Sequence, residues 1–326
     1  MNPAVSVIVP VYKVEEYIEK CARSLFEQTL KEVEYIFVND RTPDGSMDVL
    51  RRVLEDYPQR ASAVKIVDKP QNQGLPAARK SGLALATGRY ISHCDSDDWM
   101  EPNMLERMYL EADAYDADAV VCAWFSGPNP QPTKYTMAGE NCRDYIFSDM
   151  IAVGEMQSVW RYMVKREIYS KGVEFPLHNQ GEDHTLLVQL AYHCKSIYCV
   201  RMPLYHWRYN ADSITHAPSD QAVTTRFRGA CANARQVDAF LKSHGAGRRY
   251  ASETVAMKVY AMFYFRPVLR KGQGLAEWRK AFPETKGKVL FNKHIKFAHK
   301  IEYMLNIYFP PAIIRLVYKW RKRCRS

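Results

Sequence analysis

The sequence lacks the patterns that would mark it as secreted or membrane-spanning. Its eight cysteines show no Cys-x-x-Cys spacing, and several lie in apolar runs, so we expect reduced thiols in a cytoplasmic protein. No run of about 18 uninterrupted apolar residues occurs, which argues against a membrane-spanning helix. The first residues also lack the basic region, apolar core and cleavage site of a signal peptide, and we expect none.

Two phosphate-binding fingerprints are missing as well. No Gly-x-Gly-x-x-Gly follows the first apolar run, so nothing supports a dinucleotide site. There is no Walker-type lysine motif either. Loops of these two kinds are therefore not expected to hold a phosphate ligand.

Acidic residues are scarce in one region, the end of the chain. From residue 291 onward nine Lys and Arg face one acid, Glu302, which gives this segment +8 of the total net charge of +10. The rest of the chain is close to neutral. This distribution argues against nucleic acid as a partner of the main domain and directs attention to the tail.

What the chain does contain is ordinary for a folded protein, with 47% hydrophobic and 25% charged residues in 326 positions. This length allows one large domain or two smaller ones. Short β-branched runs alternate with helical periodicity, which predicts right-handed crossovers and a parallel sheet. The expected strands are 5–12, 33–38, 64–67 and 90–94, and Pro10 should end the first of them. The expected helices are 15–28, 47–54 and 75–86.

The strand expected at 90–94 leads into a cluster of acids, Asp95, Asp97 and Asp98. In an extended chain Asp95 and Asp97 would point the same way, and Ser96 and Asp98 the other. Carboxylates this close repel one another unless a cation lies between them, which favours a divalent metal site completed by water and a phosphate ligand. The alternative is a solvated turn that caps the following helix.

Ligands of parallel sheets bind at the carboxyl ends of the strands. Tyr12, Asp40 and the pair Asp95 and Asp97 all lie at such ends, so we expect them to converge. A carboxylate there can accept from a nucleobase, an aromatic ring can stack on the base, and a metal can hold a diphosphate. Taken singly, Asp40 fits a turn and Tyr12 fits core packing.

These segments together resemble the family 2 glycosyltransferases with the GT-A fold, the bacterial enzymes of surface polysaccharide assembly. The matching pieces follow the family's order over about the first 125 residues: Val5–Tyr12, Val38–Asp40, Asp44–Ser46, Asn72–Leu75, Ala78–Arg79, Gly88–Ile91 and Asp95–Trp99. Two positions depart from the family pattern, since Arg41 replaces a glycine and Lys80 an asparagine.

The resemblance implies a donor site for a nucleotide-sugar and a Mn²⁺ or Mg²⁺ ion. Asp97 would bind the metal directly, with Asp95 near the ribose and metal, and with His206 as a further ligand used by some members. The residues implied in nucleotide binding are Pro10, Val11, Tyr12, Asp40, Asn72, Gly74, Arg79, Asp95, Ser96 and Arg208. His206 has an alternative as a packed, hydrogen-bonded residue among aromatics.

The resemblance also implies a catalytic base in the second half of the chain. Gly181-Glu182-Asp183 opens an apolar helix expected over 186–192, and Asp183 matches the residue that deprotonates the acceptor hydroxyl, with Glu182 orienting it or contacting the acceptor. An inverting transferase needs one such carboxylate opposite the leaving group and no enzyme nucleophile. From composition alone, both acids fit a helix N-terminus stabilised by the macrodipole.

The last segment mixes apolar residues with Lys and Arg, and Pro310-Pro311 should divide it into two helices. A basic amphipathic helix with aromatic residues lies on an anionic membrane surface. The alternative is a helix packed on the domain with a solvated basic end. Membrane association would suit a lipid-linked acceptor.

The sequence therefore predicts an α/β GT-A fold, a Rossmann-like, mostly parallel sheet flanked by helices, with a helical, basic C-terminal extension. We expect a nucleotide-sugar half at 1–125, an acceptor and catalytic-base half at 126–220, and a helical region at 221–326. The expected function is a metal-dependent inverting transfer from a UDP-sugar to a glycan, lipid-linked, in capsule, exopolysaccharide or O-antigen assembly, on the cytoplasmic face of the bacterial plasma membrane. A nucleotidyltransferase and a non-catalytic basic binding module are the alternatives.

Overall fold

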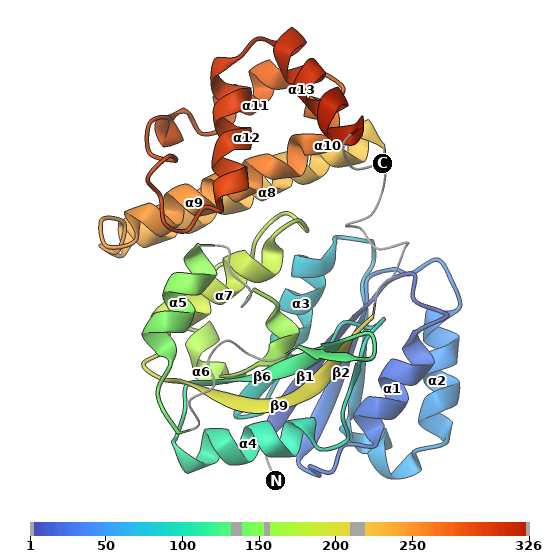
Figure 1. Cartoon of the computed structure of the whole chain (residues 1–326). Coiled ribbons are helices and arrows are strands. Elements are labelled where there is room, and N and C mark those ends of the chain that lie inside the picture. The colour runs from blue at the N-terminus through green and yellow to red at the C-terminus, as the bar shows by residue number, and fades with distance from the viewer. Residues whose placement is uncertain (1–2, 132–138, 153–156, 209–218, 324–326) are drawn as a thin grey trace. The chain divides into compact units, whose positions relative to one another are not determined.

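The structure is a computed structural model of the chain and describes residues 3–131, 139–152, 157–208 and 219–323 (Figure 1). The chain forms two compact units. The sheet unit contains Met1–Phe147, Ser158–Leu177 and Leu186–Ala211, and the helical unit contains Ser148–Gln157, His178–Thr185 and Asp212–Ser326.

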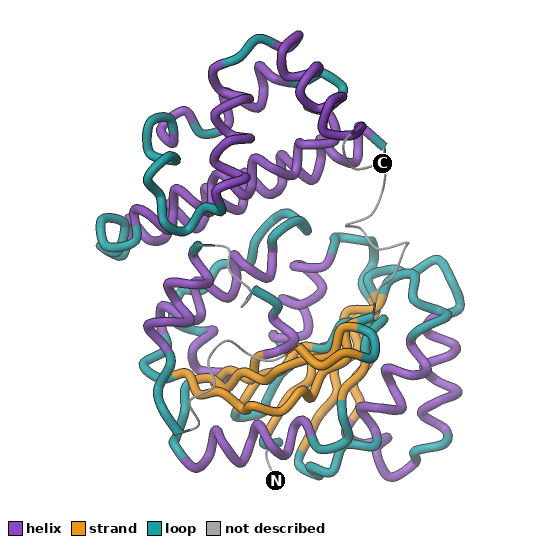
Figure 2. Tube along the Cα trace, in the orientation of Figure 1, coloured by secondary structure: helices purple, strands orange, loops and turns teal. Residues whose placement is uncertain are grey.

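The sheet unit is built on a nine-stranded sheet with the order β3-β2-β1-β4-β8-β6-β9-β5, and β7 pairs with β6. Figure 2 draws the strands in orange between purple helices. Strands β3, β2, β1 and β4 are parallel, whereas β8 runs antiparallel to both β4 and β6. The strands are β1 Val5–Val11, β2 Val33–Asn39, β3 Val64–Asp68, β4 Tyr90–His93, β5 Trp99–Met100, β6 Ala119–Ser126, β7 Asn129–Gln131, β8 Tyr162–Lys165 and β9 Ile197–Trp207. The predicted mixed α/β fold with a mostly parallel sheet is confirmed.

Strand β1 explains how the sheet holds helices on both faces. Val5, Val7 and Val9 are fully buried and share one cluster with residues of α1, α2 and α4. Ile8 faces the other way, where Gly82 of α3 comes so close that a Cβ there would lie 2.5 Å from Ile8 Cγ2. The helices of this unit and the segments joined to it are α1 Ile18–Phe26, α2 Ser46–Glu55, α3 Leu75–Leu83, α4 Met104–Ala114, α5 Arg143–Ile151, α6 Arg166–Tyr169 and α7 Glu182–His193.

Pro10 does not end the first strand, contrary to the prediction. It lies inside β1 opposite Val38, and the strand continues to Val11. The reason is that β1 pairs with β4 only as far as Ile8, so beyond that residue one side of β1 has no neighbouring strand. A proline, which lacks an N–H, is tolerated where no ladder hydrogen bond is required.

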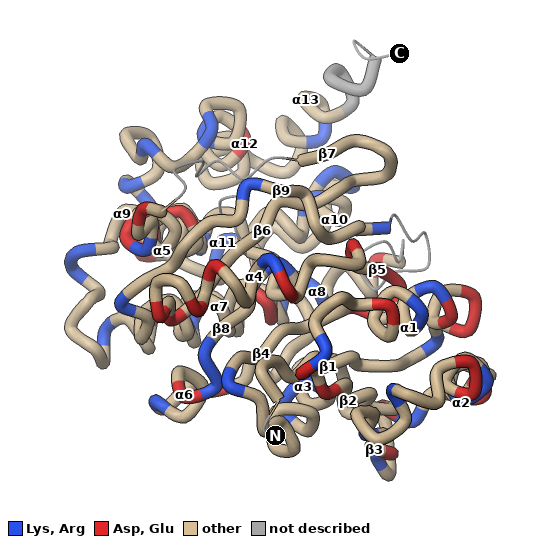
Figure 3. The backbone as a smooth tube through the Cα atoms, turned by 90° about the horizontal axis from the view of Figure 1, so that it is seen from below, with Lys and Arg blue, Asp and Glu red and all other residues tan. Residues whose placement is uncertain are grey.

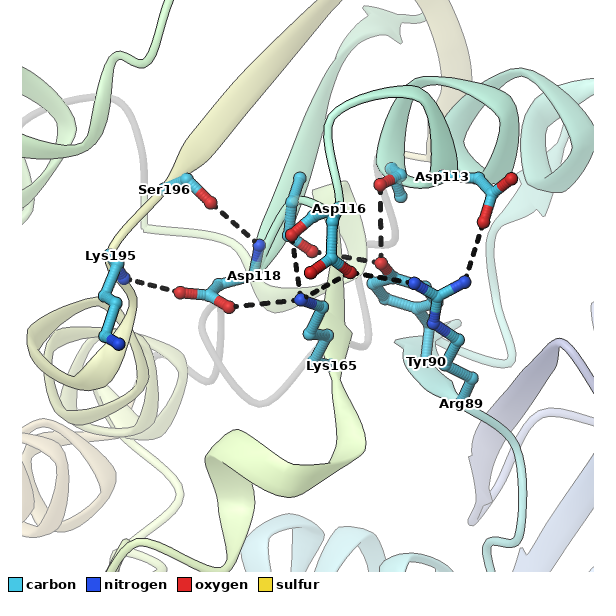
Figure 4. Close-up of polar contacts among 10 residues, drawn as sticks. Arg89, Tyr90, Asp113, Asp116, Asp118, Lys165, Lys195 and Ser196 are labelled. Carbon is cyan, nitrogen blue, oxygen red and sulfur yellow. Dashed lines mark hydrogen bonds and ion pairs between the residues drawn. The ribbon is translucent and has the colours of Figure 1, made fainter.

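At the opposite end of the sheet, an ion-pair network joins β4, α4, β6 and β8 (Figure 4). Arg89 pairs with Asp113 at 2.7 Å and with Asp116 at 2.8 Å, and Lys165 pairs with Asp116 at 2.9 Å and Asp118 at 3.4 Å. Since Asp113 and Asp116 are exposed, each pair contributes little alone. Together these ion pairs link neighbouring elements at this end of the sheet.

The helical unit contains mainly α8 Asp220–Ser243, α9 Ala251–Met262, α10 Arg266–Arg270, α11 Leu275–Ala281, α12 Phe297–Tyr308 and α13 Pro311–Arg323. Trp278 is fully buried against Tyr303, with ring centroids 5.5 Å apart, and its Nε1 donates to the Met262 carbonyl. The predicted break between the last two helices at Pro310-Pro311 is confirmed. Within the described residues, no helix is long and apolar enough to cross a membrane, and the cysteines are buried and free.

Candidate active site

The carboxyl ends of β1, β2 and β4 lie side by side because these strands are parallel neighbours. Asp40 N donates to the Val11 carbonyl at 3.0 Å, and Cys94 N donates to the Ile8 carbonyl at 3.1 Å. The structure thus brings together, at one sheet edge, the segments that carry Tyr12, Asp40 and Asp95. Pro10 and Val11 are buried in β1, whereas the Tyr12 ring is 39% exposed and can meet a ligand.

Asp40 is buried and its carboxylate organises the loop that follows β3. Oδ1 accepts from Gln73 N at 3.0 Å and Oδ2 from Gly74 N at 2.8 Å. The ammonium of Lys69, itself buried, lies 3.0 Å from Oδ1. Asp40 therefore fixes the loop that carries Asn72 and Gly74. A ligand group that donates a hydrogen bond to the Asp40 carboxylate would share it with these two backbone amides and with Lys69.

Two residues just beyond the ends of β1 and β2 adopt left-handed backbone conformations. Lys13 has φ of 55° and Arg41 has φ of 58°. Arg41 is the position where the family pattern has glycine, the residue that takes this conformation without steric cost. Lys13 N donates to Thr42 Oγ1 at 2.8 Å, so the two strained corners are joined. Strain of this kind gathers at ligand-binding sites.

The acids after β4 form a turn and not an extended segment, because β4 ends at His93 and Asp98 N donates to the Asp95 carbonyl at 3.0 Å. The predicted alternation along an extended chain is therefore wrong as geometry. Burial nevertheless separates the same two pairs, since Ser96 and Asp98 are buried and Asp95 and Asp97 are half-buried. The accessible pair is the one expected to hold a metal.

The buried side chain of Asp98 stabilises this turn through two hydrogen bonds. Its Oδ1 accepts from Arg208 N at 2.7 Å and its Oδ2 from the Tyr205 hydroxyl at 2.9 Å. Burial raises the pKa of Asp98 to about 9, and the negative charges of Asp95 and Asp97 add to the effect. The negative charge of the turn therefore lies on Asp95 and Asp97, and two carboxylates this close favour a cation between them.

Arg79 links α3 to the acidic turn. Its guanidinium is fully buried, and Nη2 donates to Asp95 Oδ1 at 2.7 Å. Loss of Asp95 would leave the buried guanidinium without this carboxylate, so the pair is expected to be firmly held. The predicted nucleotide residue Arg79 thus acts on Asp95 in this structure, and fixes the orientation of that carboxylate.

His206 lies in a stack of aromatic rings. Its ring is 4.7 Å from that of Trp99 and 4.4 Å from that of Phe125, both nearly parallel to it. Its Nε2 makes a short contact with Glu101 Oε1. These contacts support the alternative of a packed, hydrogen-bonded histidine, because metal ligation through Nε2 would require it to leave Glu101.

Two cations flank Trp99 near the acidic turn. Lys20 Nζ lies 3.2 Å from the ring centroid, and the Arg208 guanidinium lies 5.1 Å from the same ring. Burial and the charge of Arg208 lower the pKa of Lys20. Sequence reasoning named Arg208 as a diphosphate contact but missed Lys20 and Lys69. Neither lies in a motif: Lys69 comes three residues before Asn72, and Lys20 lies within the helix expected over 15–28.

The residues present fit a divalent metal. Among the residues that the structure describes, no group of three or more His, Cys, Asp or Glu could hold an ion alone. Mg²⁺ and similar ions, however, are often held by one or two carboxylates, with water and substrate phosphate completing the shell. Asp97 and Asp95, both half-buried in the turn, supply such a pair.

Glu182 and Asp183 begin α7 and belong to the helical unit. Gly181, with φ of 76°, provides the turn into the helix. Glu182 is buried and Asp183 is half-buried, so Asp183 is the more accessible of the two carboxylates. The segment predicted to close over the diphosphate is described as far as Arg208; Tyr209 and Ser213-Ile214-Thr215 lie outside the described residues.

The architecture is that of the GT-A fold. The family model for glycosyl transferase family 2 matches residues 6–168, so the chain belongs to the family 2 glycosyltransferases. The chain is 30% identical over 237 residues to the uncharacterized glycosyltransferase EpsJ of Bacillus subtilis. That match covers 68% of this chain and 66% of EpsJ, so just under two thirds of that relative's length is matched.

Solved structures share the fold. TarS of S. aureus in complex with UDP-GlcNAc superposes with a TM-score of 0.58 at 15% identity, covering 95% of this chain and 93% of that one. The mannosyltransferase PcManGT from Pyrobaculum calidifontis, in complex with GDP-Man and Mn²⁺, gives a TM-score of 0.56 at 16% identity, covering 97% of this chain and 88% of that one. At these identities the likeness concerns the fold.

Proposed function

We propose that this protein transfers a sugar from a UDP-sugar to a hydroxyl of a glycan acceptor, with inversion at the anomeric carbon and with a divalent metal. The observation that carries the proposal is the edge where Tyr12, Asp40 and the Asp95–Asp98 turn converge. Membership of family 2 favours this reaction over nucleotidyl transfer and over a binding module without activity.

In this proposal each side chain has a limited task. The exposed Tyr12 ring stacks on the base, Asp40 presents the loop with Asn72 and Gly74, and Arg208 and Lys20 face the diphosphate. Asp97 and Asp95 hold the metal, which supplies Lewis-acid stabilisation of the leaving diphosphate. Asp183 accepts the proton of the attacking hydroxyl, and Glu182 positions it. Complexes of TarS with UDP-GlcNAc and of PcManGT with Mn²⁺ support a donor and metal of these classes.

The test separates donor binding from chemistry. Asp183→Asn should bind UDP with wild-type affinity but lose nearly all transfer, because the base is removed from an otherwise intact protein. Asp97→Asn should lose Mn²⁺-dependent UDP binding. Glu167→Gln, at an exposed acid of α6, is the matched control and should change neither. Full transfer by Asp183→Asn would contradict the assignment of the base.

We further propose that the acceptor is lipid-linked and that the helical unit binds the cytoplasmic face of the bacterial plasma membrane. Its last part exposes large apolar side chains, with Phe291 89% exposed, Phe297 74% and Leu316 66%. Lysines and arginines are interspersed among them in the sequence. Figure 3 marks the Lys and Arg positions of the described backbone in blue. Exposed aromatics among cations suit an anionic bilayer surface, where each cation contributes about 1 kcal/mol.

Sedimentation with vesicles tests the membrane proposal on the full chain. Binding should require phosphatidylglycerol, fall with salt, and drop sharply in the variant Phe291→Ser, Phe297→Ser, Leu316→Ser. Leu110→Ser, at a 57% exposed leucine of α4, is the matched control and should bind as wild type does. Equal binding to neutral and anionic vesicles, or binding unaffected by the triple variant, would contradict the proposal.

A further inference from the structure

The helical unit contains a cavity of about 350 Å³ that none of the roles above uses. Its volume falls within the range of ligand sites. Gly181 and His184 line it, and these residues bracket Glu182 and Asp183 at the start of α7. Glu182 and Asp183 themselves do not line the cavity, so it adjoins the segment that carries the proposed catalytic base.

The cavity is lined by aromatic and small side chains. Tyr260, Phe263 and Tyr264 contribute the aromatic side chains, and Ala230 and Ala234 of α8 are small. The Arg266 guanidinium, which also lines the cavity, lies 3.9 Å from the centroid of the Phe263 ring and pairs with Glu302 at 2.8 Å. A slot lined by aromatic rings and small side chains suits a flat, partly apolar group.

Polar groups stand at the edge of this slot. Asn233 Nδ2 donates to the carbonyls of His178 at 3.0 Å and Gln180 at 2.8 Å, so the amide holds the segment that leads into the base motif. The structure shows no hydrogen bond to Asn233 Oδ1 from any described residue, which leaves this oxygen as an acceptor. His184 Nε2 contacts the Met150 carbonyl at 2.8 Å, and burial lowers the pKa of His184 to about 4, so it is neutral at physiological pH.

Rings with polar groups around their edge match the chemistry of a sugar, which has apolar C–H faces and hydroxyls on its rim. We propose that this cavity binds a sugar unit of the glycan acceptor against Tyr260, Phe263 and Tyr264, with Asn233 receiving a hydroxyl. This inference rests on the proposed function, since it names the acceptor subsite of the same reaction. A sugar held there would contact Gly181 and His184, the neighbours in sequence of the Glu182-Asp183 pair.

The experiment measures sugar binding and donor binding separately on the full chain. Methyl glycosides of glucose, galactose, N-acetylglucosamine and glucuronic acid are the probes, followed by saturation-transfer NMR, and UDP with Mn²⁺ is titrated into the same samples. At least one glycoside should bind the wild type. Its affinity should fall by about tenfold or more in Tyr264→Ser, which removes one ring, and in Ala234→Leu, which fills the slot.

Tyr308→Ser is the matched control, because Tyr308 is 51% exposed and Tyr264 44% exposed in the same unit. The control should bind the glycoside as wild type does, and UDP binding should be unchanged in every variant. Wild type that binds UDP but no glycoside would overturn the subsite and leave the proposed function standing. Glycoside binding without UDP binding would overturn the donor site and leave the subsite standing. If octanol binds in a manner sensitive to both variants while glycosides do not, the cavity holds a lipid and the inference is wrong.

Discussion

Replacing Glu34 with glutamine is expected to destabilise the sheet unit strongly near neutral pH and much less in acid. Glu34 is buried in β2, where Oε1 accepts from Ser6 Oγ at 2.5 Å, Thr87 N at 2.6 Å and Gly88 N at 3.2 Å. Oε2 accepts from Lys65 Nζ at 2.6 Å. One carboxylate thus joins β1, β2, β3 and the turn before β4.

The magnitude follows from the shifted pKa of this carboxyl. Burial alone raises the pKa of Glu34, but hydrogen bonds from Lys65, Ser6 and Thr87 outweigh burial and hold it at about 2, against an ordinary value of 4.5. A difference of this size is equivalent to about 3 kcal/mol. Because the Lys65 side chain is 43% exposed, solvent weakens its share, and we expect about 2 kcal/mol.

The pH dependence of this stabilisation has the sign expected for a carboxyl group whose pKa is lower in the folded protein than in the unfolded chain. The stabilisation is complete above the unfolded pKa and is lost as the pH falls toward the folded value. Urea unfolding of wild type and Glu34→Gln should therefore differ by about 2 kcal/mol at about pH 7, and the difference should shrink toward about pH 3. A difference that stays constant over this range, or none at neutral pH, would refute the reasoning.

Three further predictions concern single positions. Arg41→Gly should gain about 1 kcal/mol of stability in urea unfolding by removing left-handed strain, whereas Arg41→Ala, which keeps a Cβ, should gain nothing. Gly88→Ala should lose about 3 kcal/mol, since its Cβ would lie 2.6 Å from Ser6 N, while Gly127→Ala meets no atom within 4 Å and should lose only about 1 kcal/mol from its positive φ. His206→Phe should keep the aromatic stack and leave Mn²⁺-dependent UDP affinity unchanged in calorimetry; loss of the Mn²⁺ dependence would instead assign His206 to the metal.

The parallel half of the fold was predictable because its signals are local. The β-branched runs at Val5–Val11 and Val33–Asn39 alternate with amphipathic helices, and neighbouring parallel strands bring their carboxyl ends together. The antiparallel half was not described in advance. Strand β8 has only four residues, and β9 pairs with β6 across a register shift, so their partners depend on contacts distant in sequence.

The side-chain contacts at the site could not be predicted from the sequence, for a related reason. The motifs named Asp40 and Arg79, but they gave no sign that Asp40 holds the loop through two backbone amides or that Arg79 clamps Asp95. The extended geometry assumed for Asp95 and Asp97 was wrong because the chain turns immediately after β4. Periodicity describes regular segments, whereas sites form where those segments end.

The most direct test of the central claim is calorimetric titration of UDP, GDP and dTDP into wild type and Asp97→Ala, each with and without Mn²⁺. Wild type should prefer UDP, this binding should depend on Mn²⁺, and Asp97→Ala should lose the metal dependence. A folded wild type that binds none of the three nucleotides, or an Asp97→Ala variant that binds UDP with full metal dependence, would contradict a metal-assisted donor site at this edge of the sheet.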